Sequence, residues 1–478
     1  MMTKTDGNKM FLGGKWVEGK ELIHVYDPQD NSLISTVPKA TKEDMLQAIK
    51  LAEEGMKVAA NMSVHERIFI LNKAADYIMK HHDLYANTIA SEGSKTIREA
   101  RVEVSRCINT LRISAEEARR INGETITFDQ MPGHENRVGY TYLFPVGIIA
   151  AITPFNDPLN LVAHKVGPAI ASGNAIIVKP SSLTPLSALL LAKAFEEAGL
   201  PPKILSVITG SGGEIGDILV THPSIRMVSF TGGLKTGERI AKKIGIKKLS
   251  MELGSNSPVI VLDDANINKT VESCVSGAFW AVGQNCLGVQ RIFVVETVFD
   301  EFLEKFVERT KQYKVGDKKD EQTDMGPLIH EKEALRIEQI VIDAKQDGAK
   351  LLTGGKRDGA FYMPTVLTDV PLHSKVAQEE VFGPVVSIFP VRSLEEAIEK
   401  ANSVNYGLQA GIFTQNLDIA FQAIHQLEVG GVMINESSDY RIDSMPFGGV
   451  KGSGIGREGV KYAIKEMTEP KVVQFKLA

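Results

Sequence analysis

Apolar and polar positions in the first part of the chain follow the spacing of amphipathic helices. Residues 41–44 and 63–66 each begin with Thr or Ser and end with Asp or Glu, the spacing of a capping box, and each precedes apolar residues three and four positions apart. We therefore expect the first hundred residues to be mainly helical. A third helix is predicted from about 94 to 120, with Cys107 on its apolar stripe and therefore in the core.

From Val146 onward the pattern changes to short apolar runs separated by helical segments. Runs of this length, buried on both faces and joined through helices, are typical of a parallel, doubly wound sheet, which is a nucleotide-binding architecture. A second alternating series from Val259 to about Ile434 predicts another α/β unit of similar size. The first series comprises residues 148–152, 175–178, 205–208, 227–230 and 249–253.

Two strand-like segments lie outside both series. Residues 123–142 are polar with β-branched positions and a Pro-Gly turn, and residues 471–475 also have the pattern of a strand. These two segments can pair with each other or with another subunit.

Length and composition restrict the class of protein. With 478 residues the chain is about three times as long as a typical domain of ~150 residues, so two or three packed units are expected. Hydrophobic residues at 43% and charged residues at 24% exclude a disordered protein, a coiled coil or a collagen-like rod. The net charge of −5 comes without a block of like charge, so neither nucleic acid nor a membrane is expected as partner, and small soluble ligands remain.

Cysteine content and the start of the chain indicate a reducing compartment. Three cysteines are an odd number and too few for a disulfide framework. Residues 1–10 lack the apolar run of a signal peptide, and the longest apolar stretch, 146–152, is far below the ~20 residues of a membrane span. We expect a cytoplasmic protein.

Two glycine-rich segments follow predicted strands. In 210–216 the last glycine is one position too late for G-x-G-x-x-G, and no acidic residue ends a strand about twenty positions later, so this segment is a weak dinucleotide candidate. Residues 230–237 end a strand and open a helix, whose backbone N–H groups and dipole can receive a pyrophosphate. A tight turn without a ligand explains the second segment equally well.

Cys286 is the cysteine whose surroundings suggest chemistry. It lies among small and polar residues in 283–291, just after an apolar helix predicted at 271–282, where a turn can expose the thiol. Cys274 lies within that helix and is expected to be packed and inert. A cysteine nucleophile also needs a group that stabilises an oxyanion and a group that activates the second attacking molecule.

Asn156 and Glu252 are candidates for those two roles. Asn156 stands at the carboxyl end of a predicted parallel strand, where side chains meet ligands in such folds. Glu252 lies within an apolar strand, and because an unpaired buried carboxylate is costly, a functional role or a hidden partner is favoured.

Seven motifs occur along the chain in an order that resembles the NAD(P)-dependent aldehyde dehydrogenase superfamily, in particular its lactaldehyde dehydrogenase-like branch. The resemblance runs from roughly Phe11 to Phe475. The motifs are TPFN at 153–156, VKPS at 178–181, FTGG at 230–233, MELG at 251–254, GQNC at 283–286, EEVFGPV at 379–385 and PFGGVKGSGIGREG at 446–459.

The resemblance implies an α/β fold with two doubly wound parallel-sheet domains and a small β oligomerisation arm, assembled as a homotetramer or homodimer. An NAD(P)-binding domain is expected at 1–122 and 143–250, and a catalytic domain at 251–448. Residues 123–142 and 460–478 are expected to form the arm, which accounts for the two separate strand segments.

Roles for individual residues are also implied by the resemblance. Cys286 is expected to attack the aldehyde as a thiolate, Asn156 to stabilise the oxyanion with the Cys286 backbone N–H, and Glu252 to activate the water that hydrolyses the thioester. NAD or NADP would accept the hydride, and no metal is expected. Ser182 stands where many NAD-preferring relatives have a glutamate, so NADP should be tolerated. The implied cofactor contacts are Thr153, Pro154, Phe155, Lys179, Ser182, Phe230, Thr231, Gly232, Gly233, Leu253, Gly254, Glu380 and Phe382.

Polar residues beside the catalytic positions bear on the substrate. Asp157 follows the asparagine and Asn285 precedes the cysteine, so we expect a polar pocket. Arg106 and Arg441 match positions similar to the arginines that bind anionic groups in lactaldehyde-type relatives, and an arginine is bidentate toward an anion. Two alternatives remain open for the arginines: surface pairing with Glu103 or Asp443, or neutralisation of one arginine by Asp157, which would favour a hydroxylated aldehyde.

We therefore expect a hydrolytic aldehyde dehydrogenase that oxidises a short, hydroxylated or anionic aldehyde such as lactaldehyde. Other anionic aldehydes are alternatives, among them sulfolactaldehyde, phosphonoacetaldehyde, glyceraldehyde 3-phosphate and succinic semialdehyde. A CoA-acylating dehydrogenase is disfavoured by Glu252, since that branch generally lacks the base. A catalytically silent structural paralogue is disfavoured by the complete catalytic set.

Overall fold

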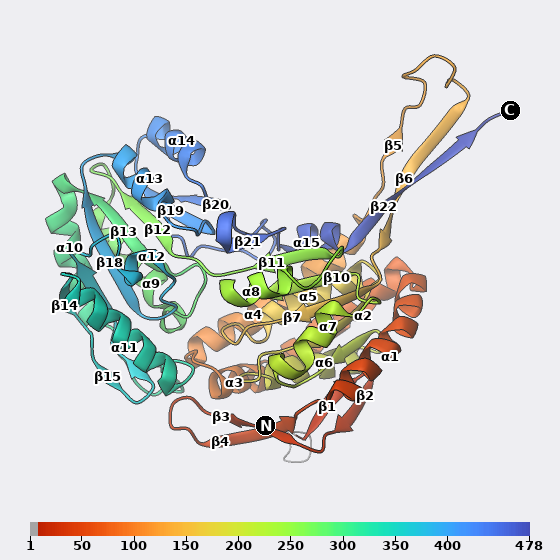
Figure 1. The fold of residues 1–478 in the computed structure, drawn as a ribbon, viewed down its shortest axis with the longest axis horizontal. Coiled ribbons are helices and arrows are strands. Elements are labelled where there is room, and N and C mark those ends of the chain that lie inside the picture. The colour runs from red at the N-terminus through yellow and green to blue at the C-terminus, as the bar shows by residue number, and fades with distance from the viewer. Residues whose placement is uncertain (1–7) are drawn as a thin grey trace.

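An eight-stranded sheet organises the first unit in the computed structural model, which describes residues 8–478 (Figure 1). In spatial order its strands are β2 (Lys15–Glu18), β1 (Lys9–Leu12), β9 (Leu205–Val207), β8 (Ala175–Lys179), β7 (Ile148–Ile152), β10 (Met227–Thr231), β11 (Lys248–Glu252) and β21 (Gly454–Ile455). The five strands from β9 to β11 are parallel and lie at the five predicted runs, which confirms the doubly wound sheet. The order reverses between β7 and β10, so their carboxyl ends flank the crevice in which such folds bind ligands.

Both faces of this sheet are apolar. In β7, Ile149 and Ala151 belong to one hydrophobic cluster, whereas Ile148 and Ala150 belong to another. Successive residues of a strand point to opposite faces, so helices must cover the sheet on both sides. The helices of this unit are α1 (Lys42–Asn61), α2 (Val64–Lys80), α3 (His82–Glu92), α4 (Ile97–Ala118), α5 (Asn160–Ala171), α6 (Leu186–Glu197), the π-helical turn η1 (Gly212–Gly216), α7 (Asp217–Thr221), α8 (Leu234–Ala241) and α15 (Val460–Glu466).

The beginning of the chain contains more strand than expected. The capping boxes at 41–44 and 63–66 are confirmed, and a third, at 96–99, begins α4. However, β1 and β2 precede them, and β3 (Leu22–Tyr26) pairs with β4 (Leu33–Pro38) as a separate hairpin. These four strands are short and only partly buried, so they lack the periodicity that reveals a strand in a sequence. Residues 1–7, most of the segment inspected for a signal peptide, lie outside the described residues.

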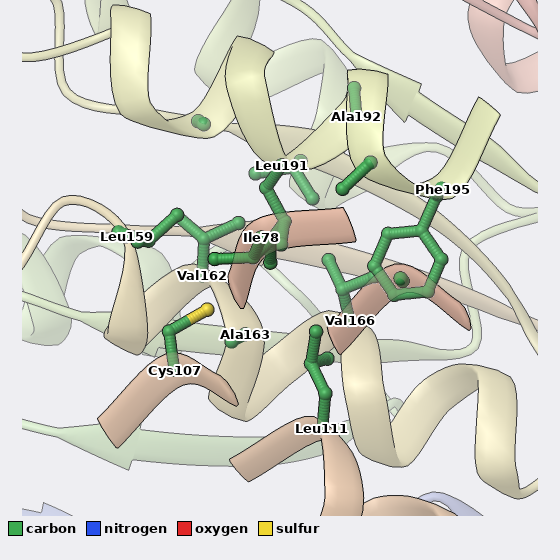
Figure 2. Close-up of a cluster of buried hydrophobic side chains, with 14 of the residues drawn as sticks. Ile78, Cys107, Leu111, Leu159, Val162, Ala163, Val166, Leu191, Ala192 and Phe195 are labelled. Atoms are coloured by element: carbon green, nitrogen blue, oxygen red, sulfur yellow. The ribbon is translucent and has the colours of Figure 1, made fainter. Parts of the chain in front are cut away.

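Cys107 lies in the apolar cluster where α2, α4, α5 and α6 meet. Figure 2 shows its sulfur close to Leu159, Val162 and Ala163, with Leu111 one turn further along α4. Cys107 is fully buried, and the predicted core position is therefore confirmed.

A seven-stranded sheet organises the second unit. In spatial order its strands are β14 (Lys350–Thr353), β17 (Thr365–Thr368), β18 (Val385–Val391), β13 (Val289–Val295), β12 (Ser257–Val261), β19 (Gln409–Phe413) and β20 (Gly431–Ile434). All neighbours except β14 and β17 are parallel, as the second alternating series predicts. The remaining elements are α9 (Ile267–Phe279), the 3-10 turn η2 (Trp280–Gly283), α10 (Glu296–Lys311), α11 (Glu331–Gln346), the hairpin of β15 (Arg357–Asp358) and β16 (Phe361–Tyr362), α12 (Lys375–Gln378), α13 (Leu394–Asn402), α14 (Leu417–Gln426) and the 3-10 turn η3 (Lys451–Ser453).

The two separate strand segments pair with each other in an arm that projects away from both sheets (Figure 1). The arm consists of β5 (Thr125–Ile126), β6 (Arg137–Pro145) and β22 (Thr468–Lys476), and β6 pairs with β22 along its whole length. The boundary predicted at 460 differs from the structure, because α15 packs its apolar residues into the core of the first unit and the arm begins only at Thr468. In residues 8–478, no helix is both long and apolar enough to cross a membrane.

Candidate active site

A polar pocket of about 390 Å³ contains the predicted nucleophile. Residues from both halves of the chain line it, and they include six that the sequence singled out. These six are Cys286, Asn156, Asp157, Asn285, Arg106 and Arg441. The tertiary structure thus brings together residues that are separated in the sequence by as many as 335 positions, the difference between 106 and 441.

A strained turn leads to Cys286. After α9, Ala281 (φ 49°), Val282 (φ 57°) and Gly283 (φ 69°) are all left-handed. This conformation costs about 1–2 kcal/mol for each residue with a Cβ, and it is a rare outlier for a β-branched side chain. Gly283 is required for a second reason, since a Cβ there would lie 2.3 Å from the Gly383 carbonyl oxygen. The turn presents the partly exposed Cys286 to the pocket, as the sequence suggested.

Burial governs the electrostatics of the cysteines. It raises the pKa of the Cys286 thiol to about 12, although the nearby Arg441 guanidinium acts in the opposite direction. Cys274 is fully buried in α9, and burial raises the pKa of its thiol well above the ordinary value, which agrees with its predicted packing role. The charges of Glu380 and Glu252 also act on Cys286 and raise the pKa of its thiol further.

Glu252 ends β11 as a buried carboxyl group. It is 3% exposed, and neither carboxyl oxygen has a hydrogen-bond partner among residues 8–478. Gly448 makes space for the group, since a Cβ at that position would lie 2.8 Å from Glu252 Oε1. Burial and the neighbouring Glu458 raise the pKa of Glu252 well above its ordinary value. Among the described residues, Glu252 is not one of those that line the pocket.

Glu458 is a buried carboxylate that the sequence argument missed. Its Oε1 lies 3.2 Å from Lys165 Nζ, and its Oε2 lies 3.3 Å from Arg441 Nη2. The Thr231 hydroxyl donates a further hydrogen bond to Oε1 at 3.2 Å. The two cations lower the pKa of Glu458 to about 2 despite its burial. Its place in the last motif was visible in the sequence, but its partners come from distant segments.

The two candidate arginines have different surroundings. Arg106 Nη2 lies 2.9 Å from Asp443 Oδ1, and its Nη1 lies 3.6 Å from Asp157 Oδ2. Arg106 therefore pairs with Asp443 and is also partly neutralised by Asp157, which are two of the alternatives considered from the sequence. It also lines the pocket. Arg441 pairs with Glu458 instead of the acids expected from the sequence, and its guanidinium lies 3.7 Å from the centre of the Phe447 ring.

Further charged residues in the pocket wall were not expected. Lys95 contacts Asp157 and lies 2.8 Å from Glu103. Asn285 donates its side-chain amide to Asp439, whose pKa is raised to about 7 by burial. A single sequence gives no signal for these contacts, since isolated Lys and Asp residues are usually solvated. The pocket is therefore polar and contains charges of both signs.

A second group of predicted residues lies at the carboxyl ends of β8 and β9. Lys179 is 6% exposed, donates to the Pro180 carbonyl at 3.0 Å, and has a pKa lowered by burial to about 8. The Ser182 hydroxyl donates to the Gly210 carbonyl at 2.9 Å. The glycine segment 210–216, a weak candidate in the sequence, thus lies beside both of these residues.

Other predicted cofactor contacts lie between this region and the nucleophile. Gly233 precedes α8 and offers no side-chain cap, which leaves the N–H groups of the first turn open to an anion. Glu380 accepts a hydrogen bond from the Ser255 N–H at 2.8 Å and lies against Gly254, where a Cβ would collide with the carboxylate. The rings of Phe155 and Phe382 meet edge to face at 5.8 Å. In residues 8–478, no cluster of three His, Cys, Asp or Glu side chains could hold a metal ion.

Comparison with known proteins identifies the family. The model of the aldehyde dehydrogenase family matches residues 16–473, and the chain belongs to this family. It is 48% identical over 451 residues to aspartate-semialdehyde dehydrogenase 1 of Pseudomonas canavaninivorans, which covers 94% of this chain and 96% of that protein. It is 45% identical over 476 residues to 3-sulfolactaldehyde dehydrogenase of Priestia aryabhattai, with 100% and 99% covered. The crystal structure of NADP-dependent glyceraldehyde-3-phosphate dehydrogenase from Bacillus halodurans, complexed with NADP, matches with a TM-score of 0.96 and 39% identity and covers 99% of this chain and 100% of that chain.

Proposed function

We propose that this aldehyde dehydrogenase oxidises a short polar aldehyde to the carboxylic acid with NAD or NADP, through a thioester on Cys286. The observation that carries the proposal is the pocket in which Cys286 and Asn156 lie together with charged and amide side chains. A thiol, an amide donor and a nearby buried carboxyl group are the three residue types that this acyl chemistry requires.

The residues divide the reaction between them as follows. The Cys286 thiolate adds to the aldehyde carbon, while the Asn156 amide and the Cys286 N–H donate to the developing oxyanion. When bound, NAD or NADP would supply the acceptor for the hydride of the substrate carbon, and Cys286 would then hold the acyl group as a thioester. Glu252 takes a proton from water, the resulting hydroxide attacks the thioester, and the acid leaves as the thiolate is regenerated. The raised pKa of Glu252 makes its ionised form a stronger base.

The cofactor would be held by elements that fit its successive parts. Lys179 offers a cation near the adenosine end, and the open N-terminus of α8 after Gly233 suits a pyrophosphate. Glu380 and Phe382 would contact the nicotinamide ribose. Ser182 carries no charge that would repel a 2′-phosphate, and the NADP-bound relative supports use of NADP.

A substrate with an anionic or hydroxylated end suits the pocket. Arg106 is 29% exposed at its side chain and faces the pocket, whereas Asp157 offers an acceptor beside it. Sulfolactaldehyde and aspartate semialdehyde, which name two relatives, are both short and carry an anionic group, a sulfonate in the first and a carboxylate beside an ammonium group in the second. Lactaldehyde carries a hydroxyl group. That group would donate a hydrogen bond to the Asp157 carboxylate or accept one from the Asn285 amide.

Turnover of an aldehyde panel with NAD and NADP tests the proposal. We expect the highest kcat/KM with anionic or hydroxylated aldehydes of three or four carbons and complete loss of activity in Cys286→Ala. Cys274→Ala serves as the matched control and should remain active. Preference for long alkyl aldehydes would contradict the proposal that the pocket binds a polar substrate. Formation of a CoA thioester would show that the acyl group is transferred to CoA and not to water. Cofactor binding without turnover of any aldehyde would indicate a silent paralogue.

The arm is proposed to mediate assembly into a homodimer or homotetramer. It projects from the molecule, and it exposes apolar side chains of Val138, Tyr142, Phe144, Val472 and Phe475. Apolar groups on a projecting sheet favour association. Light scattering after chromatography should show an oligomer, and Val472→Glu, in the middle of β22, should shift it toward the monomer.

A further inference from the structure

Glu99 on α4 contacts the strained turn that precedes Cys286. Its Oε1 accepts a hydrogen bond from the Ala281 N–H at 2.7 Å, although the two residues are 182 positions apart. Glu99 is 5% exposed and Ala281 is 4% exposed, so the N–H group would be buried without this acceptor.

The other carboxyl oxygen of Glu99 is tied to the start of α4. Oε2 accepts from the Thr96 N–H at 2.8 Å and from the Thr96 hydroxyl at 3.0 Å. The Thr96 hydroxyl in turn accepts from the Glu99 N–H at 3.3 Å. The carboxylate therefore has one oxygen on its own helix and the other on the turn, which determines its orientation.

The two other capping boxes provide an internal comparison. Asp44 and Glu66 complete the boxes of α1 and α2, which lie at the surface. Among the described residues, each accepts hydrogen bonds only from within its own box. A capping box does not need a distant N–H group, so the contact between Glu99 and Ala281 serves something other than the helix start.

Gln284 anchors the end of the same turn. Its Oε1 accepts from the Ser94 hydroxyl at 2.8 Å and from the Ile329 N–H at 3.2 Å. Ser94 and Glu99 belong to the same short segment around the start of α4. The turn is thus held at both ends by that segment, as a strained conformation requires.

We propose that Glu99 is a positioning residue for aldehyde oxidation: its hydrogen bond to the Ala281 N–H maintains the left-handed turn and thereby places the Cys286 thiol and N–H in the pocket. The proposal rests on the proposed role of Cys286. Without the acceptor, the turn relaxes and the thiol moves. A misplacement of about 1 Å can lower a rate about 100-fold.

Glu99→Ala tests the proposal, with Glu66→Ala as the matched control that removes the same kind of cap from α2. We expect Glu99→Ala to lower kcat/KM for the aldehyde about 100-fold while its cofactor Kd stays within about twofold of the wild-type value. Alkylation of Cys286 by iodoacetamide, followed by mass spectrometry, should become faster and shift to lower pH, because a displaced thiol loses the burial that raises its pKa. Glu66→Ala should change neither property.

Two further measurements separate positioning from unfolding. Cys107 and Cys274 should stay unlabelled in Glu99→Ala, since both are fully buried in the folded protein. Adding Ala281→Gly to Glu99→Ala should recover part of kcat, because glycine adopts the left-handed conformation without strain. The proposal is overturned if Cys286 alkylation is unchanged or if Glu66→Ala lowers kcat/KM as much. Alkylation does not depend on turnover, so it tests Glu99 even if the proposed oxidation fails.

Discussion

Two buried carboxyl groups, Glu252 and Glu458, are influenced by the same cations, Lys165 and Arg441, and yet their pKa values shift in opposite directions. Glu458 contacts Lys165 and Arg441 directly, and its pKa falls to about 2. Glu252 has no hydrogen-bond partner in residues 8–478, and its pKa rises well above the ordinary value. Burial is common to both, so direct partners decide which group is ionised.

The opposite pKa shifts suit a structural role for Glu458 and the proposed catalytic role for Glu252. A carboxylate that is satisfied by two cations cannot easily take a proton, whereas an unsatisfied carboxyl group can exchange one. Glu458 also occupies the cations that would otherwise ionise Glu252. Glu252 is therefore a stronger base than an ordinary glutamate, and its ionised form lowers the stability of the fold.

The largest expected effect follows from removing the base. Glu252→Gln should lower steady-state kcat about 10²–10⁴-fold, because no group activates water for thioester hydrolysis. The first turnover should still release reduced cofactor, since Cys286 and Asn156 are unchanged. Stopped-flow absorbance measures both phases. Loss of the first-turnover burst as well would show that Glu252 acts before the thioester forms.

Removing the structural charge should mainly affect folding. Glu458→Gln leaves Lys165 and Arg441 buried without their anion, which should lower the free energy of unfolding by about 3–5 kcal/mol. Glu469→Gln breaks an exposed ion pair with Lys248 and should cost less than ~1 kcal/mol. Urea unfolding compares the two variants. Similar losses would mean that burial contributes little to the Glu458 pairs.

The two groups should give stability opposite dependences on pH. The lowered pKa of Glu458 stabilises the fold above the ordinary value of 4.5, and this contribution is lost as pH falls toward about 2. The raised pKa of Glu252 means that stability is lost as pH rises above 4.5, because the unfolded state releases a proton that the folded state retains. Glu252→Gln should therefore unfold at a higher temperature than wild type at pH 8 and at the same temperature at pH 4. Calorimetry across pH would contradict this if the order reversed.

The smallest effect is expected for the neutral partner of Glu458. Thr231→Val removes one hydrogen bond of 3.2 Å while both cations remain, so the loss should be about 1 kcal/mol. Unfolding in urea measures it. A loss as large as that of Glu458→Gln would show that the hydroxyl group, and not the cations, determines the state of the carboxylate.

Much of the fold and the nucleophile follow from local sequence. The apolar runs predict the five parallel strands of the first sheet, and the surroundings of Cys286 predict a turn. The capping box of Thr96 and Glu99 could also have been predicted, since residues 96–99 have the same spacing as the boxes at 41–44 and 63–66. The strands before α1 were missed because they are only four to six residues long, and in β2 and β3 few residues are buried.

Partners across the fold could not be predicted. Both partners of Arg106, Asp157 and Asp443, were among the acids considered from the sequence, but the sequence could not choose between them because they lie in the loops after β7 and β20. Arg441 was expected in the pocket, and its pairing with Glu458 was not predicted. Glu458 is held in this region by an antiparallel β-bridge to Phe447, which is a tertiary contact. Contacts of this kind depend on which loops meet, and no local pattern encodes that.

The sequence by itself determined the family, the alternation of strands and helices after Val146, and Cys286 as the candidate nucleophile, because periodicity, caps and motifs are local properties. Only the tertiary structure decided which carboxyl group is neutral and which is ionised. Both are glutamates within the recognised motifs, and the distinction comes from two cations, Lys165 and Arg441, that pair directly with Glu458 and not with Glu252. Ionisation inside a protein depends on distances of a few ångströms, which a linear sequence does not specify.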